Sequence, residues 1–325
     1  MTALRLLAGV AAAAALADGS NLGPGSGPWT VTSPESAGLS AQALREAEEV
    51  VNDRVGGRIC HVVVKDGAIV SEIYRSAGGE NYTTAGYSTT KSQCSSLYGI
   101  AREQGWADPL ERIDSRNAGT RQCSPDAEFR HALSMTGESS DLSTPTFSYD
   151  TLGTRCLDTL SDFIQENNPE GLPTAEEWKD LHWQRPLGLE HSRWESGGGG
   201  TLPCGSGSVS PAPPSSAPVR TSLCMIDASG LRAQVMSCRD LARTALLWTN
   251  SGEWPEHGQL VSEEHIRAGR QLGPEGPGAR LTGADYGSTV WLGSADPVDP
   301  EFALFGGLFA QCAIASPRHN AVVVS

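Results

Sequence analysis

The residues best placed to do chemistry are a serine and a lysine three positions apart, Ser88 and Lys91, within GYSTTKSQCSSLYGIAREQG. Residues i and i+3 share one face of a helix, so a helix starting here would point the hydroxyl and the amine at each other. A neutral amine can then take the serine proton and create a nucleophile. Lowering a lysine pKa from ~10.4 to about 7 requires roughly 4.6 kcal/mol, part of which a buried helix start supplies.

A plainer interpretation of the same pair stays open, in which Ser88 caps a helix and Lys91 is a solvated residue of its first turn. The context favours the nucleophile. Apolar and small residues continue on a helical period after Lys91 up to a stop at Gly105, and the bulky Tyr87 precedes the serine.

Two further clusters carry groups that suit the same chemistry. Tyr149 is followed two residues later by the alcohol Thr151, so a phenol could relay a proton while the alcohol bonds it or the substrate. Taken alone, a buried structural tyrosine explains this pattern better. In FGGLFAQ, Gly307 opens an apolar strand, and the N–H of Leu308 could face an oxyanion together with the N–H of Ser88. A bulge or a sheet corner explains these glycines equally well.

The elements that must position these residues follow from periodicity and turn signals. An amphipathic helix is expected at 40–52, followed by a β-hairpin about the Lys65-Asp66-Gly67 turn and by the helix of Ser88. The remaining expected elements are helices at 126–135, 152–166, 174–183, 237–249 and 262–270, and strands at 288–292, 303–305, 308–315 and 321–324. Strands at both ends with helices between them indicate that the hairpin joins the C-terminal strands in one antiparallel sheet.

The ends and the loops are described by composition. Residues 1–17 are typical of a secretory signal peptide, with Arg5, an apolar run and a small-residue cleavage site, and 18–33 indicate a flexible segment. The apolar run is too short to span a membrane. Residues 196–218 are a Gly/Ser/Pro-rich loop. Export is therefore predicted, to a secreted or periplasmic/lumenal location.

Charge and cysteine content restrict the partners. A net charge of −14 without a basic cluster disfavours nucleic acid. No CxxC, HExxH or paired-histidine spacing occurs, so neither a metal nor another cofactor is expected. The eight cysteines are an even number, as in a disulfide-bonded protein. Their pairing cannot be read from the sequence; Cys94 is a candidate for a free thiol, and Cys204 and Cys224 could join the two ends of the loop.

Taken in order, these segments resemble the serine β-lactamase-like superfamily, in its class C-related branch of esterases and 6-aminohexanoate-dimer hydrolases. The resemblance runs from about Pro34 to Val324, and its landmarks are PESAGLS, YSTTKSxxSxLxGIAxExG, HALSMTG, FxYxTxxTxxL, RPLGLEHSRW, MSCRDLARTALLWTNSGEWPEHGQLVSEEHI and GLFAQ. It implies an α+β protein with the DD-peptidase/β-lactamase-like fold: one domain at 34–325, with an antiparallel sheet flanked by helices and a mostly helical subdomain at about 76–195.

The resemblance also assigns roles. It implies Ser88 as nucleophile, Lys91 as its base and Tyr149 as the catalytic tyrosine. Thr151 takes the position of the alcohol or amide that follows the tyrosine, and the turn at Gly307 and Leu308 supplies an oxyanion donor.

Three departures from the family pattern stand out. Phe305 replaces the cation that many relatives place before the closing glycine, which disfavours β-lactam or peptide carboxylates and favours an apolar site. Ala310 replaces a glycine, and the sequence stops at Ser325, after the last expected strand, where relatives add a helix.

The leading hypothesis is therefore a serine hydrolase that cleaves a small-molecule ester or amide through an acyl-enzyme on Ser88. The alternative is a catalytically inactive relative that serves in binding or scaffolding. An α/β-hydrolase is the weakest option, because Gly86-Tyr87-Ser88 begins a G-x-S-x-G motif but position 90 is threonine. The oligomeric state is not predicted.

Overall fold

The computed structural model describes residues 22–54, 58–116, 123–149, 155–196, 224, 232–271, 285–293, 298–307 and 311–325. The expected signal peptide and most of the Gly/Ser/Pro-rich loop lie outside these ranges. Within them, no helix is long and apolar enough to cross a membrane.

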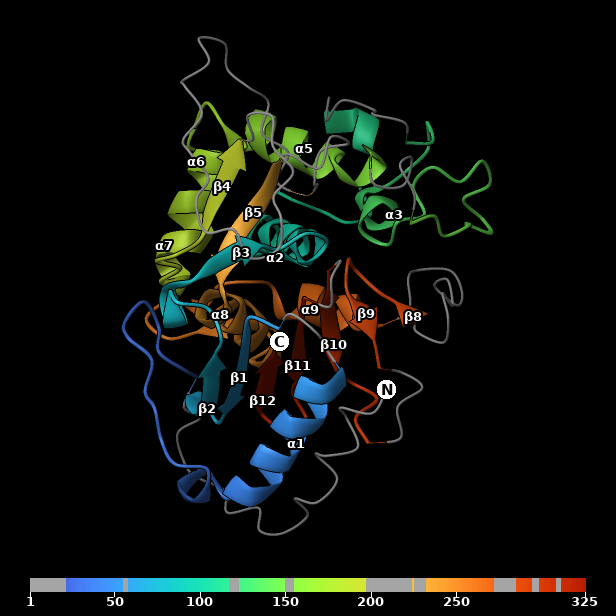
Figure 1. Cartoon of the computed structure of the whole chain (residues 1–325). Coiled ribbons are helices and arrows are strands. Elements are labelled where there is room, and N and C mark those ends of the chain that lie inside the picture. Colours follow the sequence, from blue (N-terminus) through green and yellow to red (C-terminus); the bar gives the residue numbers. More distant parts are fainter. Residues whose placement is uncertain are drawn as a thin grey trace.

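A seven-stranded antiparallel sheet forms one half of the molecule (Figure 1). Its order is β2-β1-β12-β11-β10-β9-β8, so the N-terminal hairpin pairs with the last strand, as the sequence predicts. The strands are β1 (Cys60–Lys65), β2 (Ala68–Tyr74), β8 (Asp285–Tyr286), β9 (Trp291–Leu292), β10 (Ala303–Gly306), β11 (Cys312–Ser316) and β12 (Ala321–Val324). The hairpin turns at Asp66 and Gly67, which both have positive φ, as a tight two-residue turn requires.

Helices cover both faces of this sheet. Helix α1 (Ala41–Arg54) packs on one face, where the buried Glu48 accepts a hydrogen bond from Ser71 of β2. Helix α8 (Cys238–Thr249) packs on β1, β11 and β12 from the other side. Because side chains alternate along a strand, Val62 and Val64 of β1 enter the core beneath α8 while Val63 faces α1.

The other half is mostly helical and is built around α2 (Thr89–Glu103), in which every residue from Thr89 to Ala101 is buried. Around it lie η4 (Ile113–Arg116), α3 (Phe129–Leu133), α5 (Thr159–Asn167), α6 (Ala175–Lys179), the π-helical turn η5 (Asp180–Gln184), α7 (Arg185–Leu187) and α9 (Glu263–Gly269). Trp248 of α8 donates to the Ser96 hydroxyl of α2 over 2.8 Å. This bond joins the sheet-covering helix to the central one.

Short strands complete the fold. A second sheet, which the sequence analysis missed, has the order β3-β5-β4 with β3 (Thr83–Ala85), β4 (Arg193–Ser196) and β5 (Arg232–Ser237). Strands β6 (Glu253–Trp254) and β7 (Gly258–Gln259) form a third, and 3₁₀ turns occur at η2 (Glu35–Ala37) and η3 (Gly79–Asn81). Several expected elements are shorter than predicted: α3 covers only the middle of 126–135, and β9 only the end of 288–292. Helix α3 ends before Met135 and β9 begins after Thr289, and both of these residues have a positive φ that a regular helix or strand does not adopt.

The cysteine pairing corrects two expectations. Cys94 is not free: it forms a disulfide with Cys224, so the suggested Cys204–Cys224 pair is also wrong. Cys60 pairs with Cys238 and Cys123 with Cys156, and among the described cysteines Cys312 is free. Spatial neighbours on the central helix decided this pairing, which loop composition does not reveal.

Candidate active site

The Ser88 hydroxyl meets the Lys91 amine at the start of α2. Ser88 is the residue before the helix, and the Lys91 Nζ donates to Ser88 Oγ over 3.1 Å. The backbone fixes this geometry, because the Lys91 N–H donates to the Ser88 carbonyl at 3.1 Å. Lys91 is only 5% exposed. The solvated first-turn lysine of the plainer interpretation is therefore wrong.

The turn that leads into α2 is tightly held. Tyr87 has a φ of 46°, a left-handed conformation that costs a bulky residue about 1–3 kcal/mol. The Gly86 N–H donates to the Gln234 carbonyl of β5 at 2.7 Å, and the Thr89 hydroxyl donates back to the Gly86 carbonyl at 2.7 Å. These bonds hold the chain as it turns from β3 into α2, so they place Ser88 at the helix start.

Tyr149 contacts both members of the pair. Its hydroxyl interacts with the Ser88 side chain, and the Lys91 Nζ lies 5.0 Å from the centre of its ring. The preceding residue anchors this segment, because the Ser148 N–H donates to the Met135 carbonyl at 2.9 Å. A phenol, an amine and an alcohol thus converge from α2 and from the loop after α3.

Burial shifts the two titrating groups in opposite directions. Loss of water lowers the pKa of Lys91 to about 8, so part of the amine is neutral near neutral pH and able to accept a proton. Burial raises the pKa of Tyr149, and its interaction with Ser88 opposes this only in part. The phenol therefore keeps its proton and can donate it. Two neighbouring groups with separated pKa values suit a base and an acid.

The turn after β10 lies against the entry to α2. A Cβ on Gly307 would lie 2.8 Å from the Gly86 carbonyl oxygen and 3.2 Å from the Thr89 methyl, so only glycine permits this approach. The Gly307 N–H donates to the Gln311 carbonyl at 2.7 Å, and the Gln311 amide donates to the Thr84 hydroxyl of β3 at 3.4 Å. The two ends of the predicted oxyanion turn are thereby held beside Ser88.

Four of the six residues selected from the sequence therefore come together: Ser88, Lys91, Tyr149 and Gly307. Thr151 and Leu308 lie outside the described residues. Sequence reasoning missed the aromatic rings around Tyr149, which include Trp291 at 5.4 Å between ring centres. A tryptophan on a two-residue strand carries no distinctive local pattern, so only its spatial neighbours identify it. The described residues include no cluster of three or more potential metal ligands.

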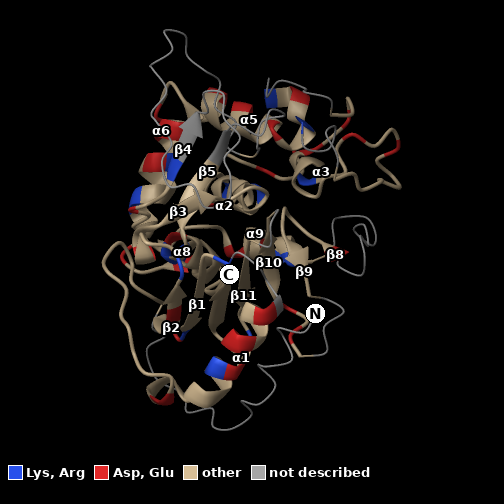
Figure 2. Cartoon of the chain, viewed as in Figure 1, with Lys and Arg blue, Asp and Glu red and all other residues tan. Residues whose placement is uncertain are grey.

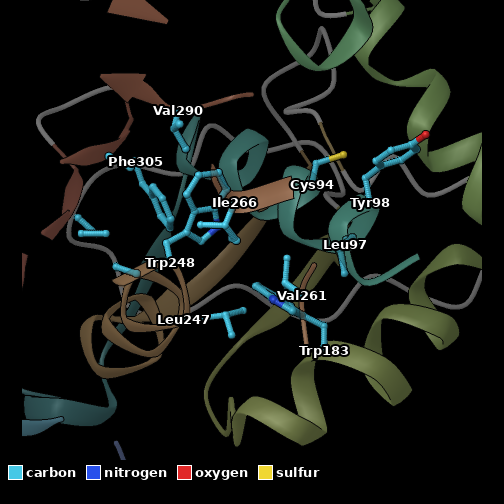
Figure 3. Packing of buried hydrophobic residues seen from close by; sticks show 14 of the residues in the cluster. Cys94, Leu97, Tyr98, Trp183, Leu247, Trp248, Val261, Ile266, Val290 and Phe305 are labelled. Atoms are coloured by element: carbon cyan, nitrogen blue, oxygen red, sulfur yellow. The ribbon is translucent and has the colours of Figure 1, made fainter. Parts of the chain in front are cut away.

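Phe305 does not line the site as the sequence analysis expects. It is 0% exposed and its ring packs edge-on against Trp248 of α8 at 5.7 Å between centres (Figure 3). The residue fills the core between the sheet and α8. It removes a cation from this position without presenting apolar surface to a substrate.

Along the ribbon of Figure 2, the described Lys and Arg residues are scattered, and Asp and Glu residues occur along several helices, α1 and α6 among them. This agrees with the net charge of −14. Among the described residues, the cation that contacts both the serine hydroxyl and the Tyr149 ring is Lys91.

Comparison with solved structures finds many chains of similar fold. A protein described as a 6-aminohexanoate-dimer hydrolase from Bacillus anthracis aligns over 85% of this chain and 74% of its own, with a TM-score of 0.60 and 15% identity. A penicillin-binding protein homologue from Caulobacter crescentus aligns over 91% and 92%, with a TM-score of 0.59 and 15% identity. EstCE1, a hydrolase with promiscuous acyltransferase activity, aligns over 90% and 93%, with a TM-score of 0.57 and 14% identity.

No protein-family model matches the sequence, and a search of curated proteins finds no match. The likeness to solved structures therefore rests on the arrangement of the chain, at 12–19% identity. The sheet order, the helices on both of its faces and the buried helix that begins at Ser88 agree with that arrangement. The chain has the β-lactamase/DD-peptidase fold, as the sequence resemblance implies.

Proposed function

We propose that the protein is a serine hydrolase that cleaves a small, uncharged ester or amide through an acyl-enzyme on Ser88. The observation that carries the proposal is the contact of the Ser88 hydroxyl with both Lys91, at 3.1 Å, and Tyr149. A hydroxyl that touches one group with a lowered pKa and one with a raised pKa has a proton acceptor and a proton donor at hand.

In the proposed acylation step, Ser88 Oγ bonds to the carbonyl carbon while neutral Lys91 takes the serine proton. The carbonyl oxygen becomes an oxyanion, which the N–H groups of Ser88 and Leu308 stabilise. Collapse of this intermediate breaks the bond to the leaving group. Tyr149 donates its proton to the leaving oxygen or nitrogen and recovers one from the Lys91 ammonium. Water then attacks the acyl-enzyme by the same route in reverse and releases the carboxylic acid.

Two features support an uncharged substrate. Phe305 supplies no cation at the position that many members of the resembled family give to one, and aromatic rings surround Tyr149. A hydrolase with an acyltransferase activity and one described as acting on 6-aminohexanoate dimers share the fold. These relatives are consistent with ester or amide cleavage. The three disulfides support export to an oxidising compartment.

The test is covalent labelling with a fluorophosphonate, followed by identification of the labelled peptide. We expect labelling of Ser88 in the wild type, none in Ser88→Ala, and hydrolysis of p-nitrophenyl acetate that is lost in the same variant. Ser92→Ala is the matched control: Ser92 lies on the same helix, but its hydroxyl donates to the Thr289 carbonyl instead. Labelling that persists in Ser88→Ala would contradict the assignment. A folded wild type that is neither labelled nor active would favour a binding or scaffolding protein.

A further inference from the structure

Four aromatic side chains gather beside the candidate active site. This aromatic cluster consists of Phe147, Tyr149, Tyr286 and Trp291. Trp291 lies 4.8 Å from Tyr286 and 5.4 Å from Tyr149 between ring centres, and Phe147 lies 6.2 Å from Tyr149 and 6.4 Å from Trp291. The rings come from the loop before residue 150 and from β8 and β9. The fold thus brings two distant segments together at the tyrosine that contacts Ser88.

The cluster is only partly covered. Tyr286 is buried and forms its base, whereas Phe147, Tyr149 and Trp291 are each half-buried. A partly exposed tryptophan beside a phenylalanine is a surface with large apolar area and few rotamers, which are the properties of an aromatic binding site. Rings at the edge of a core have the same properties, so the position of these rings relative to Ser88 is what distinguishes a binding site from a core edge.

Trp291 is held next to the predicted oxyanion turn. A Cβ on Gly306 would lie 3.0 Å from the Trp291 Cδ1 and 3.1 Å from its Nε1. Gly306 precedes Gly307, which itself packs on the backbone before Ser88. Trp291 therefore lies between this turn and Tyr149. A substrate group that extends from Ser88 past Tyr149 meets Trp291 and Phe147 next.

This step rests on the proposed function, which gives the direction of proton transfer. That direction identifies the substrate group that lies past Tyr149. Tyr149 hands its proton to the leaving atom, so the part of the substrate beyond that atom lies near the rings that surround Tyr149. Charge agrees with an uncharged occupant: the cation recorded against this cluster among the described residues is Lys91, which already contacts Ser88 and Tyr149.

We propose that the aromatic cluster is a binding site for the leaving group, and that Trp291 and Phe147 select esters of aromatic alcohols such as benzyl alcohol. Ser88 Oγ adds to the acyl carbon first, and the bond between that carbon and the benzylic oxygen breaks when the oxyanion intermediate collapses. The alkoxide takes the Tyr149 proton and leaves as the neutral alcohol. The acyl-enzyme is then the same whichever alcohol has left, so the selection acts on acylation alone.

The experiment compares benzyl acetate with ethyl acetate, which share the acyl group. We expect kcat/KM of the wild type to be about tenfold or more higher for benzyl acetate. Trp291→Ala should bring the ratio close to one, and Trp291→Phe should restore most of it. Phe147→Ala should lower the ratio as a second, independent variant. Trp106→Ala is the matched control, because Trp106 is also a partly buried tryptophan among aromatic rings, but it packs on Phe163 and Trp178.

A second readout does not need turnover. In the inactive Ser88→Ala protein, saturation-transfer NMR should detect bound benzyl alcohol, and this signal should disappear when Trp291→Ala is added but persist with Trp106→Ala. Equal rates for the two acetates in a wild type whose Ser88 is labelled would overturn the leaving-group site and leave the proposed function standing. A ratio that survives both Trp291→Ala and Phe147→Ala would also overturn it. Absence of both ester turnover and Ser88 labelling would overturn both proposals.

Discussion

At the scale of single residues, burial gives an amine and a phenol the protonation states that the proposed function requires. The two groups contact the same hydroxyl, yet burial moves the pKa of Lys91 down and that of Tyr149 up. Burial disfavours the charged form in both cases, and the charged form of lysine is the protonated one whereas that of tyrosine is the deprotonated one. One physical cause thus favours both a neutral amine and a protonated phenol.

The first prediction concerns pH. Below about pH 8 Lys91 carries its proton and has no lone pair for Ser88, because its pKa is lowered to about 8. We expect kcat/KM for a neutral ester to be low at pH 6 and to rise with an apparent pKa near 8, while Tyr149 stays protonated throughout. The buried His61 and His265 have pKa values lowered to about 4, so neither should titrate in this range. A profile that is flat from pH 6 to 9 would contradict Lys91 as the base.

The second prediction concerns the phenol. Tyr149→Phe removes one hydroxyl but keeps the ring contacts with Trp291 and Phe147. We expect kcat to fall by about 10²–10⁴-fold with the thermal midpoint of unfolding nearly unchanged. Steady-state kinetics and differential scanning calorimetry check the two parts. An unaltered rate would indicate that Tyr149 has a purely structural role.

The third prediction is a gain in stability at the cost of activity. A drop in the pKa of Lys91 from 10.5 to about 8 corresponds to about 3 kcal/mol, at ~1.4 kcal/mol per unit. Below pH 8 the amine is protonated in both the folded and the unfolded chain, so burial of its charge destabilises the folded state by the whole of this free energy. Between pH 8 and 10.5 this destabilisation disappears, because the folded chain loses the proton first.

Lys91→Met, which cannot be protonated, should therefore be inactive but more stable than the wild type by up to about 3 kcal/mol at pH 6. The difference should shrink as the pH rises past 8. Urea denaturation at pH 6 and pH 10 measures it. A variant that is less stable than the wild type at both pH 6 and pH 10 would show that burial of the charged amine does not destabilise the folded wild type.

At the scale of elements, covalent links hold the segments that meet at Ser88. The Cys123–Cys156 disulfide joins residues on either side of Tyr149 and closes a loop with a separation of 33 residues. A Cβ on Gly137 would lie 2.4 Å from the Cys156 sulfur, so the HALSMTG segment packs directly on this bridge. The Cys60–Cys238 disulfide instead joins β1 to α8. The two bridges allow stability and positioning to be separated.

The fourth prediction uses this pair of bridges. Replacing both cysteines of either bridge by alanine should lower the free energy of unfolding by about 2–5 kcal/mol. Under folding conditions, only the loss of Cys123–Cys156 should also reduce kcat, because it frees the segment that carries Tyr149. Denaturation curves and kinetics on the two double variants provide the measurement. Equal effects on kcat would mean that the bridge near Tyr149 does not position it.

At the scale of the whole molecule, the sheet and the helical half share one hydrophobic core. Figure 3 shows Phe305 and Trp248 from the sheet side of this core together with Leu97 and Tyr98 of α2. Trp248 also donates to Ser96 of α2. A substitution beneath the candidate site therefore acts first on the packing of this core.

The fifth prediction follows for Phe305. A lysine there would place a charge against Trp248 in a fully buried position, so Phe305→Lys should lower the free energy of unfolding by at least about 3 kcal/mol. It should not create turnover of nitrocefin or benzylpenicillin, and we expect none in the wild type. Phe305→Leu is the control and should cost about 1–2 kcal/mol. A stable Phe305→Lys protein that binds benzylpenicillin would show that this side chain does reach the substrate.

Local sequence determined the features that depend on neighbours along the chain. The Ser88–Lys91 contact is an i, i+3 relation at a helix start, the hairpin follows from Asp66-Gly67, and α8 begins where Ser237 caps it by accepting from the Asp240 N–H. Each of these depends on backbone geometry that a few residues set. The expected strands at both ends of the chain, with helices between them, also predicted the sheet that joins the two ends.

Tertiary structure decided the features that depend on which distant segments pack together. It brought Tyr149 and Gly307 to Ser88, buried Lys91 deeply enough to lower its pKa, and paired Cys94 with Cys224. It also turned Phe305 into the core, because a strand presents alternate side chains to opposite faces and only the packing of α8 decides which face is covered. Trp291 entered the site in the same way, since no local pattern distinguishes a core ring from one that lies beside a nucleophile.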